Sequence, residues 1–147
     1  MLSNTCKYAM RAVVYLAINA GTDQLINIKT ISEDLKLPTP FLGKILQTLA
    51  KAGLLLSAKG PTGGFMLAKP ATEISFYDVV KVIDGTSMFD ECLFGMEICK
   101  SCCDNKMLCP MYSTSDTLRH SLKDLFADNS IANLAKGLLG TGAENAI

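Results

Sequence analysis

The stretch LKLPTPFLG, residues 35–43, constrains the fold of this chain more than any other. Its two prolines stand two residues apart, so no regular helix can run through this point. The segments 28–36 and 40–52 on either side both carry apolar residues at helical spacing. We therefore expect two helices joined by a short turn, with Thr39 as the N-cap of the second helix and Pro40 at its first position.

The elements around this pair complete a small domain. Residues 5–20 are predicted to form a helix that Gly21 ends, and residues 75–83 another. Between them, LLLSAKGPTGGFMLA contains two short apolar runs, 54–58 and 65–68, around the turn KGPTGG. Glycine and proline exclude a helix in that turn and favour a β-hairpin. A helix-turn-helix followed by a hairpin predicts a winged helix-turn-helix.

The last third of the chain is predicted to be helical after a cysteine-rich stretch. A long helix over 113–127 carries an apolar stripe, and a short helix over 131–139 follows. The stripe consists of Leu118, Leu122, Leu125 and Phe126. The expected fold class is mainly α with a small β-hairpin wing. The expected divisions are a winged helix-turn-helix over 1–85, a cysteine-rich loop over 86–110, a dimerisation helix and C-terminal helix over 111–139, and a flexible tail over 140–147.

Charge is unevenly placed along the chain although the net charge is zero. Residues 1–72 carry eight Lys/Arg and three Asp/Glu, whereas residues 73–147 carry six and eleven, so the halves are +5 and −5. From Pro40 to Lys69 there are four lysines and no acid. Such a patch on a helix-turn-helix and its wing favours DNA as a partner, although an ordinary solvated surface is the plainer interpretation.

Five of the six cysteines lie between residues 91 and 110. No stretch approaches the ~18–20 apolar residues that span a bilayer, and no small-residue cleavage site follows the first apolar segment. We therefore expect a cytoplasmic protein with reduced thiols, where clustered cysteines bind metal or do redox chemistry. An iron–sulfur cluster, a zinc site built on Cys99-x2-Cys102 and a metal-free thiol switch all stay open. A thiol oxidoreductase or electron carrier is a further alternative, but no βαβ setting surrounds that cysteine pair.

Four parts of the sequence carry a family resemblance: MLSNTCKYAMRAVVYLA, ISEDLKLPTPFLGKILQTLAKAGLL, the wing KGPTGGF and a cysteine stretch that ends in CP. Across residues 1–135 the chain resembles the Rrf2 family of bacterial transcription regulators. The resemblance implies a homodimeric winged helix-turn-helix that is not an enzyme. It also implies that the long C-terminal helix pairs with the partner subunit, and that redox state, nitric oxide or iron–sulfur status is sensed.

The resemblance implies that the third helix and the wing contact a pseudo-palindromic DNA duplex. The residues predicted to contact DNA are Thr39, Pro40, Lys44, Gln47, Thr48, Lys51, Lys59, Thr62, Gly63 and Gly64. The family's base-reading acid in this helix is replaced by Gly43, which we expect on the exposed face. Base preference should differ accordingly.

The resemblance also implies a [2Fe–2S] or [4Fe–4S] cluster in the cysteine loop. Cys92, Cys99 and Cys109 match the family's three ligands by position. Several members have a histidine three places after the third cysteine, where this chain has Tyr112, so Cys102 or Cys103 is the predicted fourth ligand. The spacing Cys103-x5-Cys109 also matches the family, which would make Cys99 the spare.

Two isolated residues are given plain interpretations. Cys6 is predicted to be a small buried hydrophobe rather than a ligand. His120, the one histidine, is predicted to be an ordinary residue of the surface or of a dimer interface.

Overall fold

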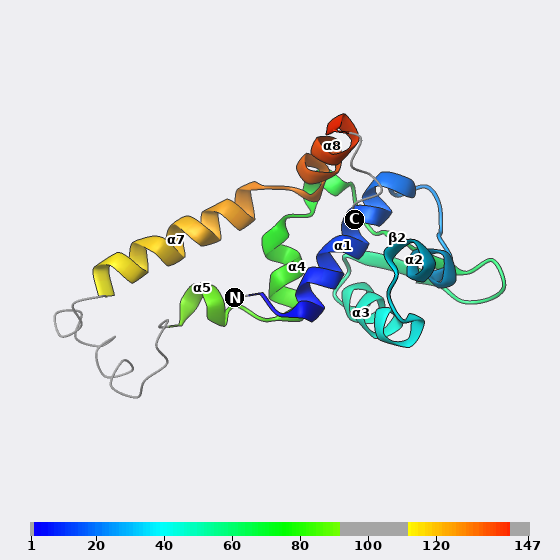
Figure 1. Ribbon diagram of the computed structural model, residues 1–147, viewed down its shortest axis with the longest axis horizontal. Coiled ribbons are helices and arrows are strands. Elements are labelled where there is room, and N and C mark those ends of the chain that lie inside the picture. The colour runs from blue at the N-terminus through cyan, green and yellow to red at the C-terminus, as the bar shows by residue number, and fades with distance from the viewer. Residues whose placement is uncertain (1, 92–111, 142–147) are drawn as a thin grey trace.

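A computed structural model describes residues 2–91 and 112–141 of the protein. Within these ranges the chain is mostly helical with a two-stranded antiparallel hairpin, which confirms the predicted fold class. Figure 1 shows a head built from α1–α4 and the hairpin, with α7 extending away from it. The elements are α1 (Asn4–Asn19), α2 (Ile28–Leu35), α3 (Thr39–Lys51), β1 (Leu55–Ala58), β2 (Gly64–Leu67), the 3-10 helix η1 (Ala71–Glu73), α4 (Phe76–Ile83), α5 (Ser87–Asp90), α7 (Tyr112–Asp128) and α8 (Ile131–Thr141).

Helix α1 is the central element of the head. Its apolar face is fully buried and packs against α2, α3, α4, β2 and α8. We call the resulting cluster the main core; its largest fully buried side chains are Leu16, Ile31, Leu35, Leu42, Leu46, Leu49, Leu55, Leu67, Ile74 and Ile131. Because α1 lies under both helices of the predicted helix-turn-helix, it sets the platform on which they sit.

Side-chain caps fix the starts of α1 and α4. Ser3 accepts a hydrogen bond from the Cys6 backbone N–H at 3.0 Å, and its own hydroxyl donates to Asp84 at 2.5 Å. Ser75 and Asp78 form a capping box at the start of α4, in which each side chain accepts from the other residue's backbone N–H. The carboxylate of Asp84, just beyond α4, therefore ties the start of α1 to the end of α4.

The hairpin is the predicted wing; β1 begins one residue later than predicted and ends where predicted, and β2 lies one residue earlier. Leu55 pairs with Leu67 and Ala58 with Gly64. The chain before α2 joins this sheet, because Ile26 and Phe65 exchange two backbone hydrogen bonds of 2.9 Å each. The wing is thus hydrogen-bonded to the lead-in of the helix-turn-helix.

Helix α7 runs back toward the head, and α8 packs against the head after it (Figure 1). The Ile131 N–H donates to the Ile74 carbonyl at 2.8 Å, and the Phe76 N–H donates to the Asn129 carbonyl at 3.1 Å. Ile131 itself is fully buried in the main core. The two helices predicted as one C-terminal unit thus have different surroundings. Helix α8 also runs two residues beyond its predicted end at 139.

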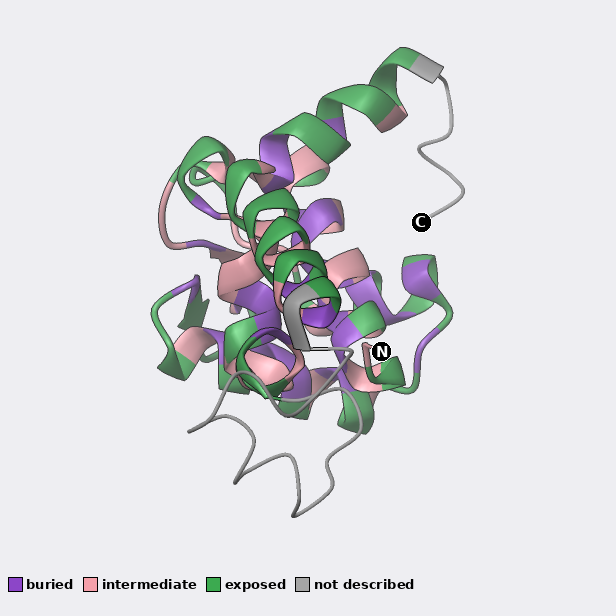
Figure 2. Cartoon of the chain, turned by 90° about the vertical axis from the view of Figure 1, so that its left-hand side faces the viewer, coloured by how far each residue is buried: buried purple, intermediate pink, exposed green. Residues whose placement is uncertain are grey.

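Helix α7 is the most solvent-exposed long element. In Figure 2, where it points toward the viewer, most of its surface is coloured as exposed. Its predicted stripe is divided: Leu122 and Phe126 are half-buried against α4 and α5, whereas Leu118 and Leu125 are 61% and 57% exposed. Nothing in the sequence pattern predicted η1 or the short α5. None of the helices in the described ranges is both long and apolar enough to span a membrane.

Candidate nucleic-acid interface

A short turn joins α2 to α3. Asn27 begins α2 by accepting a hydrogen bond from the Lys29 N–H at 2.9 Å. Lys36 ends it in the left-handed conformation, with φ of 53°, and the Leu37 N–H returns to the Ser32 carbonyl at 3.0 Å. This backbone arrangement stops a helix sharply. The turn therefore has the abrupt geometry of a helix-turn-helix.

The predicted start of α3 is wrong by one residue. Pro38 is the N-cap, and Thr39 and Pro40 occupy the first two helical positions. The first four N–H groups of a helix have no partner within it, so a proline fits the second position as well as the first. The Thr39 hydroxyl does not cap the helix but lies 2.8 Å from the hydroxyl of the buried Ser32.

Helix α3 has one apolar and one cationic face. Leu42, Ile45, Leu46 and Leu49 are buried. The opposite face carries the predicted contact residues Lys44, Gln47, Thr48 and Lys51, all of them exposed. No acidic residue lies anywhere in α3, so its outer face presents only positive and neutral groups.

Gly43 does not belong to that outer face, contrary to expectation. It is half-buried, and a Cβ atom built on it would lie 3.2 Å from the Ile28 Cδ1 atom. The position therefore faces α2, and the missing side chain lets the two helices approach closely.

The residues predicted to contact DNA from the wing are of two kinds. Lys59 and Thr62 are exposed. Gly63 and Gly64 are constrained by the fold: an added Cβ would lie 2.3 Å from the Ala58 carbonyl oxygen and 2.2 Å from that of Ile26, respectively. Both glycines are therefore required by backbone packing, whether or not they approach DNA.

The helix and the wing face a shared groove. It has a volume of about 710 Å³ and lies between α3 and β1, with Gln47, Lys51 and Lys59 among its lining residues. Lys44 and Thr48 line a second hollow of about 240 Å³ beside Thr5 of α1. The structure thus brings predicted residues of α3 and the wing onto one groove, while other predicted residues of α3 line a separate hollow.

Polar and aromatic contacts between α1 and the helix-turn-helix hold this surface in place. The rings of Tyr8 and Phe41 pack edge-to-face with centroids 5.8 Å apart. Arg11 donates to the Leu35 carbonyl at 3.3 Å, and the Tyr15 hydroxyl donates to Asp34. Burial, followed by the bond to Asp34 and its charge, raises the pKa of Tyr15 to about 12. These supporting residues could not be predicted from the sequence because each contact joins segments far apart in the chain.

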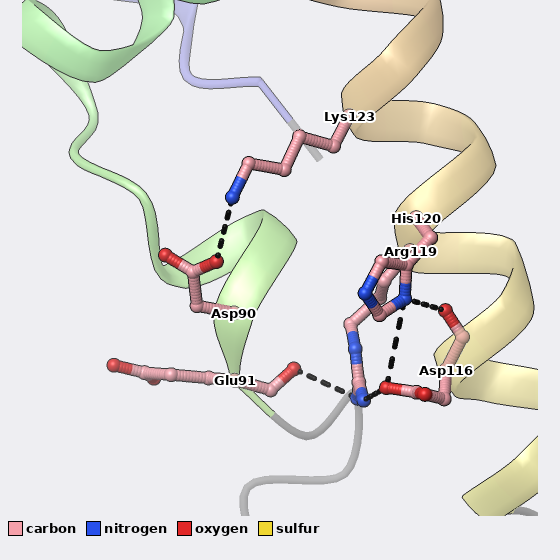
Figure 3. A network of polar contacts seen from close by, with 6 residues as sticks. All are labelled: Asp90, Glu91, Asp116, Arg119, His120 and Lys123. Atoms are coloured by element: carbon pink, nitrogen blue, oxygen red, sulfur yellow. Dashed lines mark hydrogen bonds and ion pairs between the residues drawn. The ribbon is translucent and has the colours of Figure 1, made fainter.

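A polar cluster joins α5 to α7 on the other side of the molecule (Figure 3). The buried Arg119, 7% exposed, donates to the Glu91 carbonyl at 3.2 Å and to Asp116 at 2.9 Å. Lys123 lies 3.5 Å from the Asp90 carboxylate. We call these five residues the α5–α7 clasp. It connects the two described segments that flank residues 92–111.

The contacts within and beside the clasp lower the pKa of one of its carboxylates. A hydrogen bond from Thr86, and after it the charges of Lys123 and Arg119, keep the pKa of Asp90 below its usual value. His120 is exposed beside the clasp, and its Nδ1 atom lies 2.8 Å from the Asp116 carbonyl oxygen. This agrees with the prediction of an ordinary surface histidine.

A second core lies beneath the clasp. Its buried members are Cys6, Val80 and Phe89, and the Phe89 ring packs 5.7 Å from that of Phe126. Burial, and then the charge of Asp84 and a hydrogen bond to it, raise the pKa of the Cys6 thiol to about 11. The thiol is therefore protonated at neutral pH, and the prediction of a small buried residue is confirmed. This core joins α1, α4, α5 and α7.

The predicted cluster ligands lie outside the described residues. These are Cys92, Cys99, Cys102, Cys103 and Cys109. Within the described ranges, no group of three or more His, Cys, Asp or Glu side chains is arranged to hold a metal ion.

Comparison with known proteins gives a match over nearly the whole chain. Residues 2–137 match the model of the Rrf2 family, described as an iron-dependent transcriptional regulator. An HTH-type transcriptional regulator of Aquifex aeolicus is 33% identical over 134 residues, covering 91% of this chain and 90% of the relative. The HTH-type transcriptional regulator IscR of Cereibacter sphaeroides is 31% identical over 86 residues, covering 58% of this chain and 56% of IscR.

Solved structures share the fold. CymR, the global cysteine regulator of B. subtilis, superposes with a TM-score of 0.73 at 21% identity, covering 92% of this chain and 96% of CymR. IscR of T. potens superposes with a TM-score of 0.68 at 23% identity, covering 93% of this chain and 87% of IscR. At these identities the superpositions concern the fold alone.

Proposed function

The chain belongs to the Rrf2 family of transcriptional regulators, and from that premise we propose that it binds a pseudo-palindromic DNA site as a homodimer and senses a signal through its cysteine-rich segment. The family consists of regulators rather than enzymes. Because bacterial DNA lies in the cytoplasm, we propose that the protein acts there.

The DNA-contacting surface in this proposal is the outer face of α3 together with the wing tip. The observation that carries it is the shared groove, which Lys51 of α3 and Lys59 of the wing both line. Duplex DNA carries one negative charge per ~1.7 Å of its axis, so clustered lysines without neighbouring acids favour binding. A helix fits the major groove, where Gln47 can pair with adenine and Lys44 with guanine or phosphate.

The dimer in this proposal forms through α7. Leu118 and Leu125 lie seven residues apart and are both largely exposed. Seven residues make two helical turns, so both side chains project on the same side and suit a matching stripe on a second copy. A two-fold dimer would present two α3 helices to two half-sites.

The sensing element in this proposal is an iron–sulfur cluster held by Cys92, Cys99 and Cys109, with Cys102 or Cys103 as fourth ligand. Five thiolates within eighteen residues are a donor set that soft iron–sulfur and zinc centres prefer. The description of the family as iron-dependent supports iron over zinc. When bound, such a cluster supplies reversible electron transfer and sensitivity to oxidants.

The described residues offer a physical connection from this segment to DNA. The α5–α7 clasp holds both flanks of residues 92–111, and the second core includes Cys6 of α1. The same helix, α1, contacts α3 through Tyr8 and Phe41. A change at the cysteine segment could therefore reach α3 through packed elements, with a coupling of about 1–3 kcal/mol if it is of ordinary size.

Two measurements on protein purified without oxygen test the proposal. We expect the visible absorption of an iron–sulfur cluster with matching iron and sulfide, and preferential binding of particular genomic fragments over random duplex. Colourless protein that still prefers particular fragments would contradict the iron–sulfur cluster and favour a zinc site or a thiol switch. Protein that prefers no fragment, with or without metal, would overturn the proposed function.

A further inference from the structure

Two hydroxyl groups and a carbonyl form a chain of hydrogen bonds at the turn between α2 and α3. The Ser32 Oγ atom lies 2.5 Å from the Leu37 carbonyl oxygen. The same Oγ atom lies 2.8 Å from the Oγ1 atom of Thr39. Ser32 is only 8% exposed, so this chain is anchored inside the protein.

The direction of each bond follows from the available protons. A hydroxyl carries one proton and a carbonyl carries none. Ser32 must therefore donate to Leu37, since no other proton can lie between those two oxygens. The Ser32 oxygen then accepts from Thr39, because two oxygens 2.8 Å apart repel each other without a proton between them. Thr39 has no second proton, so toward any outside partner it can only accept.

This restricts what Thr39 can bind on DNA. Phosphate oxygens only accept hydrogen bonds, as do the N7 and O6 atoms of guanine and the O4 atom of thymine. The donors that base edges offer in the major groove are the amino groups of adenine and cytosine. Thr39 is half-buried at the first position of α3, the end of a recognition helix that contacts bases.

We therefore propose that Thr39 determines specificity at one position on one strand of each half-site, by accepting a hydrogen bond from an amino base, adenine or cytosine, on that strand. This inference rests on the proposed DNA-binding function and adds the polarity of one base contact to it.

Neighbouring residues of α3 show why Thr39 differs. Lys44 can only donate, which suits phosphate and guanine, and Gln47 can do both. Thr48 also donates its proton internally, to the Lys44 carbonyl at 2.9 Å, but it is exposed and its partner is a backbone carbonyl of its own helix rather than a buried hydroxyl. Its hydroxyl can turn toward solvent, whereas that of Thr39 is fixed by a buried partner.

The test selects bound sequences from random duplexes and compares four proteins. Wild type is expected to prefer an amino base over a keto base at the position read by Thr39. Thr39→Val keeps the shape but removes the oxygen, and should lose about threefold to tenfold of that preference. Thr39→Ser keeps the hydroxyl and should retain it. Ser32→Ala frees the Thr39 proton, so keto bases should become acceptable at the same position.

The outcomes separate this inference from the function on which it rests. If wild type enriches no sequence, the proposed function fails. If wild type enriches a site and Thr39→Val enriches it equally, or weakens all sequences equally with a shallower salt dependence, the inference about Thr39 fails alone. Circular dichroism and thermal melting check that each variant is folded. Should Ser32→Ala unfold, the pair Thr39→Val and Thr39→Ser decides the result.

Discussion

Helices α3 and α7 both pack one face against the protein and expose the other, but the exposed faces have opposite chemistry. The outer face of α3 carries Lys44 and Lys51, whereas that of α7 carries Leu118 and Leu125. Helix α3 rests on the main core, while α7 rests on the small second core and the clasp. The molecule therefore presents two surfaces that suit different partners. The outer face of α3 suits a polyanion, and that of α7 suits an apolar surface.

The largest expected effect concerns the apolar face of α7. Leu118→Lys combined with Leu125→Lys should raise the dimer dissociation constant by at least about a hundredfold, because each buried leucine contributes about 1.5–3 kcal/mol. Sedimentation velocity over a concentration series measures it. The matched control is Ala127→Lys. Ala127 lies on the opposite side of the helix from Leu118, so this variant should leave the dimer intact. Equal effects from both variants would mean that α7 pairs through another face or not at all.

A second test removes the buried cation that supports α7. Arg119→Met leaves Asp116 and the Glu91 carbonyl without their partner, so the free energy of unfolding should fall by about 2 kcal/mol. Lys123→Met breaks the more exposed pair with Asp90 and should cost less than about 1 kcal/mol. Urea unfolding compares the two variants. Equal losses would show that the clasp gains nothing from the burial of Arg119.

The support of α7 should also weaken at high pH through Cys6. Its pKa rises from an ordinary value of 9.0 to about 11 on folding, so above pH 9 the unfolded chain releases the proton and the folded chain keeps it. The stabilisation is complete below pH 9 and disappears by about pH 11, a loss on the order of 2 kcal/mol. Urea unfolding under reducing conditions should show a larger loss between pH 9 and 11 in wild type than in Cys6→Ala, because the raised pKa of Tyr15 contributes equally to both proteins. If the free energy of unfolding fell in parallel with pH in both proteins, the proposed role of Cys6 would be wrong.

The smallest effects concern the lysines of α3 and the wing. Lys51→Ala and Lys59→Ala should each reduce the slope of log affinity against log salt concentration by about 0.9, provided that each lysine neutralises one phosphate. Lys136→Ala, on the exposed surface of α8, is the control. Fluorescence anisotropy with a labelled duplex measures the slopes. If all three variants changed it equally, the outer face of α3 would have no special role.

Local patterns were sufficient to predict the longer helices and the hairpin, but not η1 or α5. The apolar periodicity and the helix-ending glycines located the long helices, and Gly21 and Gly53 have φ values of +57° and +76°. The start of α3 was misplaced because a proline is compatible with two positions of the first turn. Gly43 was expected on the exposed face of α3, but the approach of Ile28 places it against α2. The sequence of α3 alone does not encode that approach.

The parts of the candidate site that sequence reasoning missed depend on contacts between distant segments. Arg119 meets a carbonyl 28 residues earlier in the chain, and Asp34 meets Tyr15 across the turn between two helices. A backbone carbonyl carries no sequence signal, so an arginine that binds one looks like any surface arginine. Gly64 was predicted from its place in the wing, yet its strict steric need comes from the Ile26 backbone.

Helix α7 is fastened to its own subunit at two points, by Arg119 at its middle and by the backbone bonds around Ile131 just beyond its end. A rod fixed at two points can rotate or tilt only together with the body that holds it. Two copies that meet along such rods would therefore associate side by side, since exchanging the helix between subunits would require undoing both attachments. The angle between the rods would then set how far apart the two heads stand.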